Sequence, residues 1–286
     1  MPGLTSILAR LIRPRQEEHS APPAVPPLPP SSKGPDWDAV RERYREYPRE
    51  VLGYATVRDY CDSADHMPYL LDFDSDLKDV QRAWMVKAIL CRMSAGTRLI
   101  EIGGGVPKSS SALASLGYKP VIVDPYEGQG NGPTEFDEFR KAHPKIEFVR
   151  ELFSGSLTQF KPSSADCIFS VSTLEHIHNQ TPIFEGIDKF LKPGGWSIHC
   201  VDISIRGTME IFSTGLIEDV LRRQRELAGM PPDDGEYKRL VDKMRDDIDT
   251  YYLGPQGLHR WRGGRAYDEF PFQPIVSIQT CVQKRV

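Results

Sequence analysis

The sequence predicts an α/β fold built on a doubly wound, mostly parallel β-sheet. Two short apolar runs, residues 99–102 and 120–123, end at a glycine turn and at Asp124, respectively. Short apolar runs of this kind are typical of parallel strands that are buried on both faces. From residue 96 to residue 203, strand-like and helix-like segments alternate, which indicates consecutive β-α-β units.

Residues 1–35 are expected to form a disordered tail. Residues 4–13 make a short amphipathic segment that could anchor at a membrane interface or dock as a helix, although a solvated segment is favoured. Proline and serine dominate residues 21–35, which favours an extended linker. The folded part is therefore expected to begin near Trp37.

Residues 36–95 hold two predicted helices, at 38–47 and 76–93, because apolar residues recur there at helical spacing. A less regular piece is expected between them. The core, residues 96–205, continues with a helix after the glycine turn, whose N-cap candidates are residues 108–111. Its other predicted elements are helices at 135–142 and 181–191, strands at 145–149 and 196–203, and a strand with its following loop at 165–177.

The chain after residue 205 is predicted to add an insertion and a final strand. Apolar stripes indicate amphipathic helices near residues 216–227 and 237–248, inside an insertion that spans 206–266. Residues 275–282 alternate between apolar and polar side chains, within a C-terminal piece 267–286. This alternation predicts a strand that pairs antiparallel with its neighbour and completes the sheet.

The glycine turn, residues 103–105, predicts a site for a nucleoside-type cofactor. Glycines let a ligand approach the backbone, and the N-terminus of the following helix attracts negative groups. Asp124 follows the turn at the ~20-residue spacing expected of a partner for a ribose. Lys108 stands where a dinucleotide fingerprint has its third glycine, and Pro107 stands where a P-loop has the glycine before its lysine.

Glu101-x-Gly103-x-Gly105 resembles motif I of the class I S-adenosylmethionine-dependent methyltransferases, although Pro107 replaces a glycine that is frequent in that family. Residues 165–177, which end in Leu-Glu-His-Ile, resemble the family's fourth strand and its loop. Residues 191–196, Leu-Lys-Pro-Gly-Gly-Trp, resemble its turn into the fifth strand. The resemblance covers residues 96–202 and implies a Rossmann-like sheet and methyl transfer from S-adenosylmethionine.

The resemblance also implies which residues hold the cofactor. The turn would face the methionine part of the cofactor and Asp124 its ribose. The adenine would contact either Glu151 or an apolar wall formed by Leu152 and Phe153. The expected cofactor-binding residues are Glu101, Gly103, Gly104, Gly105, Asp124, Pro125, Glu151, Leu152, Ser170 and Val171. By the same analogy, residues 36–95 would form a helical lid and residues 206–266 a substrate cover. Tyr60, His66 and Tyr69 are pocket candidates in the lid, although loop and core packing is favoured for them.

The predicted reaction is an in-line displacement, for which the protein aligns the reactants and removes a proton. Histidine or a carboxylate suits the role of general base near neutral pH. His176 and His178 follow the fourth predicted strand, Asp202 lies near the exit of the fifth, and His259 lies in the expected cover. A structural hydrogen bond is the favoured role for His176. No metal site is predicted. Carboxylate and imidazole groups can ligate a metal, but no ligand spacing is recognisable among Glu175, His176, His178 and Asp202.

Composition narrows the class of acceptor. A net charge of −4 provides no basic field for nucleic acid. With the size of the expected cover, the family resemblance then implies a small-molecule acceptor, such as a natural-product intermediate or a sugar. Five cysteines without a C-x-x-C pair suit a reducing cytoplasm. Two alternatives remain: an NAD-dependent oxidoreductase on the same fold, and a non-catalytic scaffold that docks a partner through residues 4–12. The oligomeric state stays open.

Overall fold

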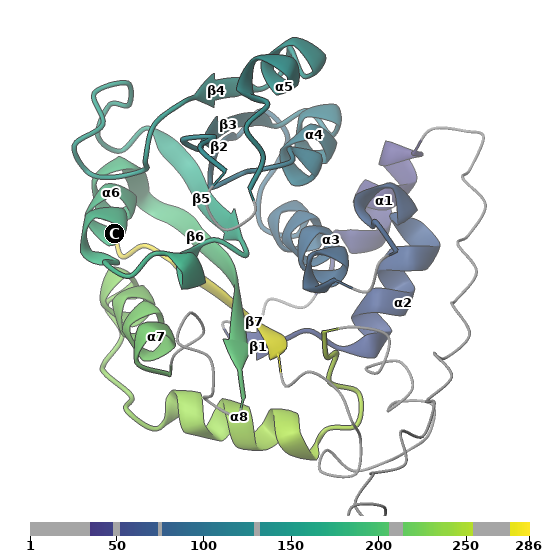
Figure 1. Cartoon of the computed structure of the whole chain (residues 1–286), viewed down its shortest axis with the longest axis vertical. Coiled ribbons are helices and arrows are strands. Elements are labelled where there is room, and N and C mark those ends of the chain that lie inside the picture. Colours follow the sequence, from purple (N-terminus) through teal and green to yellow (C-terminus); the bar gives the residue numbers. More distant parts are fainter. Residues whose placement is uncertain (1–34, 48–51, 74–75, 129–131, 206–213, 254–274) are drawn as a thin grey trace, which may run out of the picture. The chain divides into compact units, whose positions relative to one another are not determined.

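A computed structural model describes residues 35–47, 52–73, 76–128, 132–205, 214–253 and 275–286. A seven-stranded sheet with the order β1-β7-β6-β5-β2-β3-β4 organises this part of the chain (Figure 1). The strands are β1 (Leu52–Tyr54), β2 (Arg98–Ile102), β3 (Lys119–Val123), β4 (Glu147–Val149), β5 (Ala165–Val171), β6 (Leu191–Ser204) and β7 (Ile275–Gln283). Strands β2 to β6 pair in parallel, whereas β7 runs antiparallel to both β6 and β1. The predicted fold class, including its antiparallel C-terminal strand, is confirmed.

The register of the central strands brings three chain segments to one edge of the sheet. Ile102, the last residue of β2, lies opposite Val123 on β3 and Ser170 on β5. The residues that follow these strands therefore meet at the carboxyl ends of parallel strands, where ligands bind in open α/β sheets.

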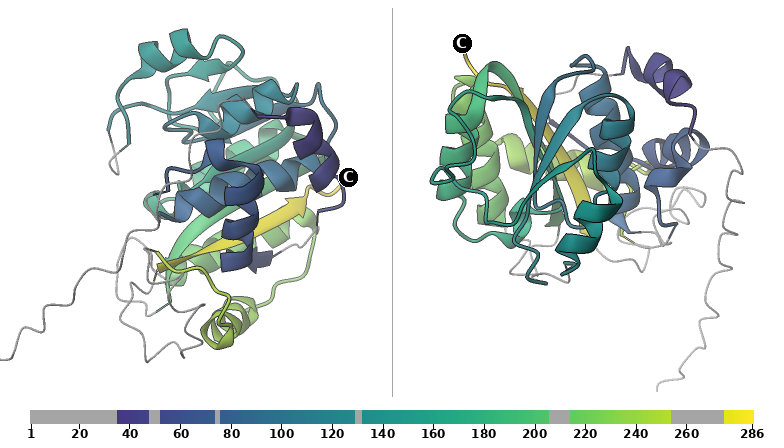
Figure 2. Two further views of the ribbon diagram at one scale, coloured as in Figure 1. Left: turned by 90° about the vertical axis from the view of Figure 1, so that its right-hand side faces the viewer. Right: turned by 90° about the horizontal axis from the view of Figure 1, so that it is seen from above.

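Helices cover both faces of the sheet, as the two views of Figure 2 show. The helices α1 (Trp37–Tyr44), α2 (Val57–His66), α3 (Leu77–Leu90) and α4 (Lys108–Ser115) belong to one apolar cluster, which includes Leu99 and Phe169. The helices α6 (Thr181–Phe190), α7 (Thr214–Ala228) and α8 (Glu236–Asp246) belong to a second cluster, which includes Ile100 and Ile168. Alternate side chains of β2 and β5 thus pack on opposite faces of the sheet. A short helix, α5 (Phe136–Ala142), packs near Tyr126 beyond β3.

Two local expectations are wrong. The piece expected to be less regular contains β1 and the helix α2, which begins where the Thr56 side chain accepts a hydrogen bond from the Asp59 amide. Helix α4 has Pro107 at its N-cap and no side-chain cap, so residues 108–111 do not cap it. Ser110 instead lies inside the helix, where its hydroxyl donates a hydrogen bond to Glu101.

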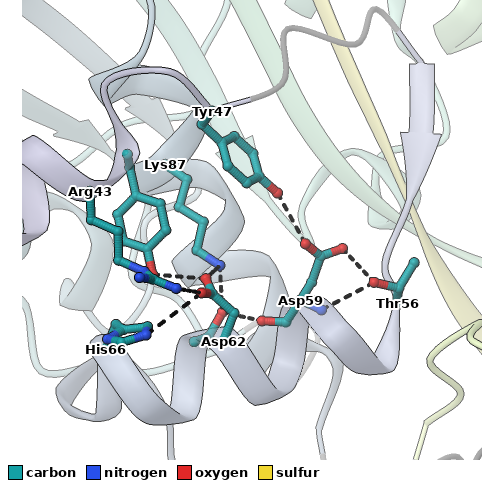
Figure 3. Close-up of polar contacts among 9 residues, drawn as sticks. Arg43, Tyr47, Thr56, Asp59, Asp62, His66 and Lys87 are labelled. Carbon is teal, nitrogen blue, oxygen red and sulfur yellow. Dashed lines mark hydrogen bonds and ion pairs between the residues drawn. The ribbon is translucent and has the colours of Figure 1, made fainter.

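A polar network ties α1, α2 and α3 together around Asp62 (Figure 3). The Asp62 carboxylate accepts hydrogen bonds from Lys87 at 2.6 Å, Arg43 at 2.7 Å and the Tyr44 hydroxyl at 2.8 Å. Lys87 is only 1% exposed. Burial would raise the pKa of Asp62, but hydrogen bonds from Lys87 and Arg43 outweigh it and lower the pKa to about 2. The network therefore gives the buried Lys87 side chain an acidic partner and fixes α2 against α3.

Several expectations concern residues that this structure does not describe or does not place at a pocket. The amphipathic segment 4–13 and His259 lie outside the described residues. Tyr60 stacks on Tyr251 with ring centres 5.2 Å apart, and Tyr69 contacts the ring of Trp37, so both serve in packing. In the described ranges, no helix has the length and apolar character that crossing a membrane requires.

Candidate active site

A cavity of about 430 Å³ opens where β2, β3 and β5 end. One side is formed by the glycine turn and the segment after β3, and the other by the segment after β5 and by α3. The lining residues are Lys78, Arg82, Glu101, Gly103, Gly104, Gly105, Val106, Ser109, Asp124, Pro125, Glu127, Gly128, Gly132, Pro133, Leu152, Val171, Ser172, Thr173, Glu175, His176, Ile177 and His178.

The glycine turn is shaped by its neighbours on β3 and after β5. Gly103 has a φ of +65°, and a Cβ there would lie 2.3 Å from Cγ2 of Thr173. Its amide donates to the Val123 carbonyl at 2.9 Å, and the Thr173 hydroxyl donates to its carbonyl at 3.2 Å. Position 103 therefore requires glycine on two grounds, the left-handed conformation and the close approach of Thr173.

Asp124 is held in place by backbone donors. Its Oδ2 accepts the amide of Gly105 at 3.0 Å, and its Oδ1 accepts the amide of Tyr126 at 2.7 Å. The Tyr126 hydroxyl in turn donates to the Gly105 carbonyl at 3.1 Å. Because each carboxylate oxygen has a further lone pair, Asp124 can still accept hydrogen bonds from a ligand in the cavity.

Glu101 is the buried acid at the base of the turn. It is 3% exposed, and burial raises its pKa to about 7, against the opposing effects of the Ser110 hydrogen bond and the charge of Arg82. Its charge therefore changes near neutral pH. A ligand cation beside Glu101 would favour the ionised form.

Helix α3 gives the cavity a cationic wall that the sequence analysis missed. Lys78 and Arg82 both line the cavity, and their spacing of four residues puts them on one face of α3. Arg82 pairs with Asp72 at 2.6 Å, and Lys108 of α4 contacts the same carboxylate. Only the helical spacing of Lys78 and Arg82 was visible in the sequence. Nothing in it indicated that α3 would face the glycine turn.

A second acidic group is formed by Glu175, in the segment after β5, and Asp202, on β6. The carboxyl of Asp202 accepts hydrogen bonds from the Gln81 amide at 2.6 Å and from the Ser172 hydroxyl at 2.9 Å. The Asp202 amide donates to Oε1 of Glu175 at 3.2 Å. Burial raises the pKa of Asp202 to about 6, and burial together with the charge of Asp202 raises the pKa of Glu175 well above its usual range.

The predicted site residues that the structure describes divide into three groups. Glu101, the three glycines, Asp124, Pro125, Leu152, Val171, His176 and His178 line the cavity. Asp202 stands behind Ser172, through which it contacts the wall. Ser170 and Glu151 do not line the cavity, because Ser170 is buried against His199 and Glu151 accepts a hydrogen bond from Gln159 at the surface. Within the described residues, no group of three or more His, Cys, Asp or Glu side chains is placed to hold a metal.

Comparisons with known sequences give one family match. A family model described as a methyltransferase domain matches residues 54–230, which is more than half of the chain. A search of curated protein sequences gives no match.

Solved structures resemble the chain at low identity. The [4+2]-cyclase SpnF is 14% identical over 88% of this chain and 98% of its own, with a TM-score of 0.47. The YcgJ protein from Bacillus subtilis is 16% identical over 72% of this chain and 98% of its own, with a TM-score of 0.42. An S-adenosylmethionine-dependent methyltransferase from Mesorhizobium loti is 20% identical over 44% of this chain, with a TM-score of 0.36. The match spans 54% of that protein's own length.

Proposed function

The chain belongs to the methyltransferase-domain family. We propose that this S-adenosylmethionine-dependent methyltransferase acts on a small-molecule acceptor, which enters the cavity beside the glycine turn. The acceptor is proposed to be a natural-product intermediate or a sugar. The observation that carries the proposal is the common cavity of Glu101, the glycine turn and Asp124.

The residues of this cavity fit the cofactor. Asp124 keeps lone pairs for ribose hydroxyls, and Glu101 lies at the base of the turn, where it can pair with the ammonium group of the amino-acid part. Leu152 is 64% exposed although it is a large apolar residue, and it offers a surface for the adenine. When bound, S-adenosylmethionine supplies an activated methyl group.

The candidate bases lie across the cavity from the turn. His176 and His178 line it, and partial burial together with the charge of Lys78 lowers the pKa of His176, so its ring is neutral at pH 7 and can accept a proton. Asp202 is the third described candidate. The helical part at 36–95 is proposed as the lid, because α3 contributes Lys78 and Arg82 to the wall. The insertion 206–266 is proposed as the substrate cover.

The acidic net charge and the free state of all five cysteines support a cytoplasmic enzyme that does not act on nucleic acid.

Calorimetric titration of the full chain with S-adenosylmethionine, S-adenosylhomocysteine and NAD, in parallel, tests the proposal. We expect micromolar binding of both sulfur nucleosides and none of NAD. Binding of NAD in their place would restore the oxidoreductase alternative. Tight binding of the sulfur nucleosides with no methyl transfer to any small-molecule class would favour the scaffold.

A further inference from the structure

We propose an acceptor subsite in this methyltransferase, formed by Ser172, Glu175 and Asp202. The subsite takes a substrate with a proton-bearing hydroxyl or amine, and the proton passes from the substrate through Ser172 to Asp202. The inference rests on the proposed function, because it names the substrate class for the same cavity. It goes further because it names a single route for the acceptor proton, with Asp202 as the base among the candidates.

The first observation is an unpaired polar atom in a buried side chain at the cavity wall. Glu175 is 1% exposed and lies in a short 3-10 helix, Leu174–His176, that follows β5. Its Oε1 accepts the Asp202 amide, but its Oε2 has no hydrogen-bond partner among the described residues. Leaving a buried carboxyl oxygen unpaired is costly unless a ligand satisfies it. Glu175 therefore points to a polar ligand on this side of the cavity.

The second observation is the backbone of Ser172. Its φ is +51°, a conformation that a non-glycine residue adopts only at a cost. The conformation is fixed by the Ser172 amide, which donates to the Cys200 carbonyl at 3.0 Å. It leaves the Ser172 hydroxyl at the cavity wall, donating to Oδ2 of Asp202. Ser172 is thus the residue that links the cavity to Asp202.

The two carboxyl groups differ in their donors, which decides where the negative charge lies. Asp202 receives two side-chain donors, and Gln81, one of them, is itself held by Ser277 of β7 at 2.7 Å. Glu175 accepts the Asp202 amide at 3.2 Å and shares the Ser172 hydroxyl with Asp202, whereas Asp202 has the Gln81 amide in addition. Two neighbouring buried carboxyls do not both ionise readily. Asp202 therefore carries the charge, and Glu175 keeps a proton that it can donate to an oxygen of the acceptor.

The proton transfer balances with this charge state. A bond forms between the methyl carbon and the acceptor oxygen or nitrogen, and the methyl–sulfur bond breaks with its electron pair left on sulfur. The acceptor proton moves to Oγ of Ser172 while the Ser172 proton moves to Oδ2 of Asp202. The positive charge of the sulfonium and the negative charge of Asp202 disappear together, so no net charge is created in the buried site.

The same charge predicts which acceptors are rejected. A carboxylate brings a second negative charge to Asp202 and has no proton to give, whereas an alcohol or an amine satisfies both conditions. Besides Glu175, Asp76 and Lys78 at the start of α3 also act on Asp202. The charges of Lys78 and Asp76 are of opposite sign and offset each other, so Asp202 remains the anionic group of the subsite.

Binding of three simple probes tests the inference without knowledge of the natural substrate. Benzyl alcohol, benzylamine and benzoate share one ring and differ in the group of interest. They are titrated by NMR into the full chain saturated with S-adenosylhomocysteine. We expect the alcohol and the amine to bind and benzoate to bind at least roughly tenfold more weakly, since benzoate brings a like charge to Asp202 and has no proton to donate.

Three variants separate the roles of the residues. Ser172→Gly removes the hydroxyl, and glycine readily adopts the positive φ of this position. Ser163→Gly is the matched control, because Ser163 has a φ of +50° and does not line the cavity. We expect Ser172→Gly and Asp202→Asn to weaken the alcohol and the amine roughly tenfold, and Ser163→Gly to change neither. In ¹³C-carboxyl NMR titrations, Asp202→Asn should lower the pKa of Glu175, because it removes the neighbouring charge.

The outcomes distinguish the two levels of the proposal. If the wild-type chain does not bind S-adenosylhomocysteine, the proposed function fails. If it binds this nucleoside but prefers benzoate, binds none of the probes, or responds equally to the two glycine variants, the proposed function stands and the acceptor subsite is overturned. An unchanged Glu175 titration in Asp202→Asn overturns it as well.

Discussion

Replacing His199 should change how the stability of this protein depends on pH. His199 lies on β6 and is 0% exposed. Its Nδ1 lies 2.8 Å from the Ser170 hydroxyl and its Nε2 lies 2.8 Å from the Ser197 hydroxyl, which also accepts a hydrogen bond from Gln224 at 2.9 Å. Burial lowers the pKa of His199 from 6.5 to about 3. The folded protein therefore holds this ring neutral across the physiological range.

The sign of the effect follows from the lowered pKa. Between pH 6.5 and about 3, the unfolded chain binds a proton at His199 that the folded chain does not bind. The contribution of His199 to stability is therefore fully present above pH 6.5 and is lost as the pH falls. Its slope is about 1.4 kcal/mol per pH unit, which amounts to about 3 kcal/mol between pH 6.5 and pH 4.5.

The assay is urea unfolding of the wild type and of His199→Gln between pH 7.5 and pH 4.5. The difference between the two is the informative quantity, because the raised pKa values of Glu101 and Asp202 act on the wild-type curve with the opposite sign. We expect the variant to be less stable at pH 7.5 and the difference to shrink by about 3 kcal/mol at pH 4.5. A difference that stays constant over this range would refute the reasoning. His143→Gln controls for the loss of a histidine outside the buried network.

Gly103→Ala should abolish cofactor binding in calorimetry, because the new Cβ would lie 2.3 Å from Thr173 Cγ2. Asp124→Ala should weaken cofactor affinity at least roughly tenfold, since hydrogen bonds to a charged group are lost, and an unchanged affinity would contradict the ribose assignment. In the wild type, cofactor affinity should rise from pH 6 to pH 8 as Glu101, with a pKa of about 7, ionises next to an ammonium group. Glu101→Gln should remove that rise, and a rise that persists would exclude Glu101 as its cause. Lys87→Met should lower the free energy of unfolding in urea by about 3 kcal/mol, because a buried ion pair is broken, and adding Asp62→Asn should recover part of it. A double variant no more stable than the single one would contradict this pairing.

The fold was predictable where the pattern is local. The buried strands β2 and β3 are apolar runs bounded by turn residues, so their type follows from their sequence alone. Strand β1 was missed because it has three residues and acquires its partner, β7, from the other end of the chain. Helix α2 was missed because its buried residues, Val57, Tyr60 and Ser63, include only two apolar side chains. Its stability depends on tertiary contacts such as the Asp62 network, which local propensity does not reveal.

The same division applies to the candidate site. The glycine turn and Asp124 could be placed together from the sequence, because the carboxyl ends of adjacent parallel strands lie at the same edge of the sheet. Ser170 is one residue from the end of β5, and strand alternation turns its side chain to His199 rather than to the cavity. The cationic wall formed by α3 could not be predicted, because α3 precedes the core in the chain and the sequence does not show where this helix packs. Sequence spacing alone does not contain that information.

The two halves of the cavity therefore have different physical origins, and this has a consequence for specificity. Apart from Leu152 after β4, the cofactor half is built by consecutive segments of one β-α-β unit. The acceptor half is assembled from α3, the segment after β5, and β6. Substitutions at Ser172, Glu175 or Asp202 can change the substrate without changing the glycine turn. They leave in place Thr173, which contacts Gly103, and the hydrogen bonds of these three residues do not involve Asp124 or Glu101. Energetic effects of sites without shared partners are close to additive. Ser172→Gly and Asp124→Ala should accordingly act independently, the first on probe binding and the second on affinity for S-adenosylhomocysteine. Strong coupling between them in a double-mutant cycle would mean that the two halves are not separate.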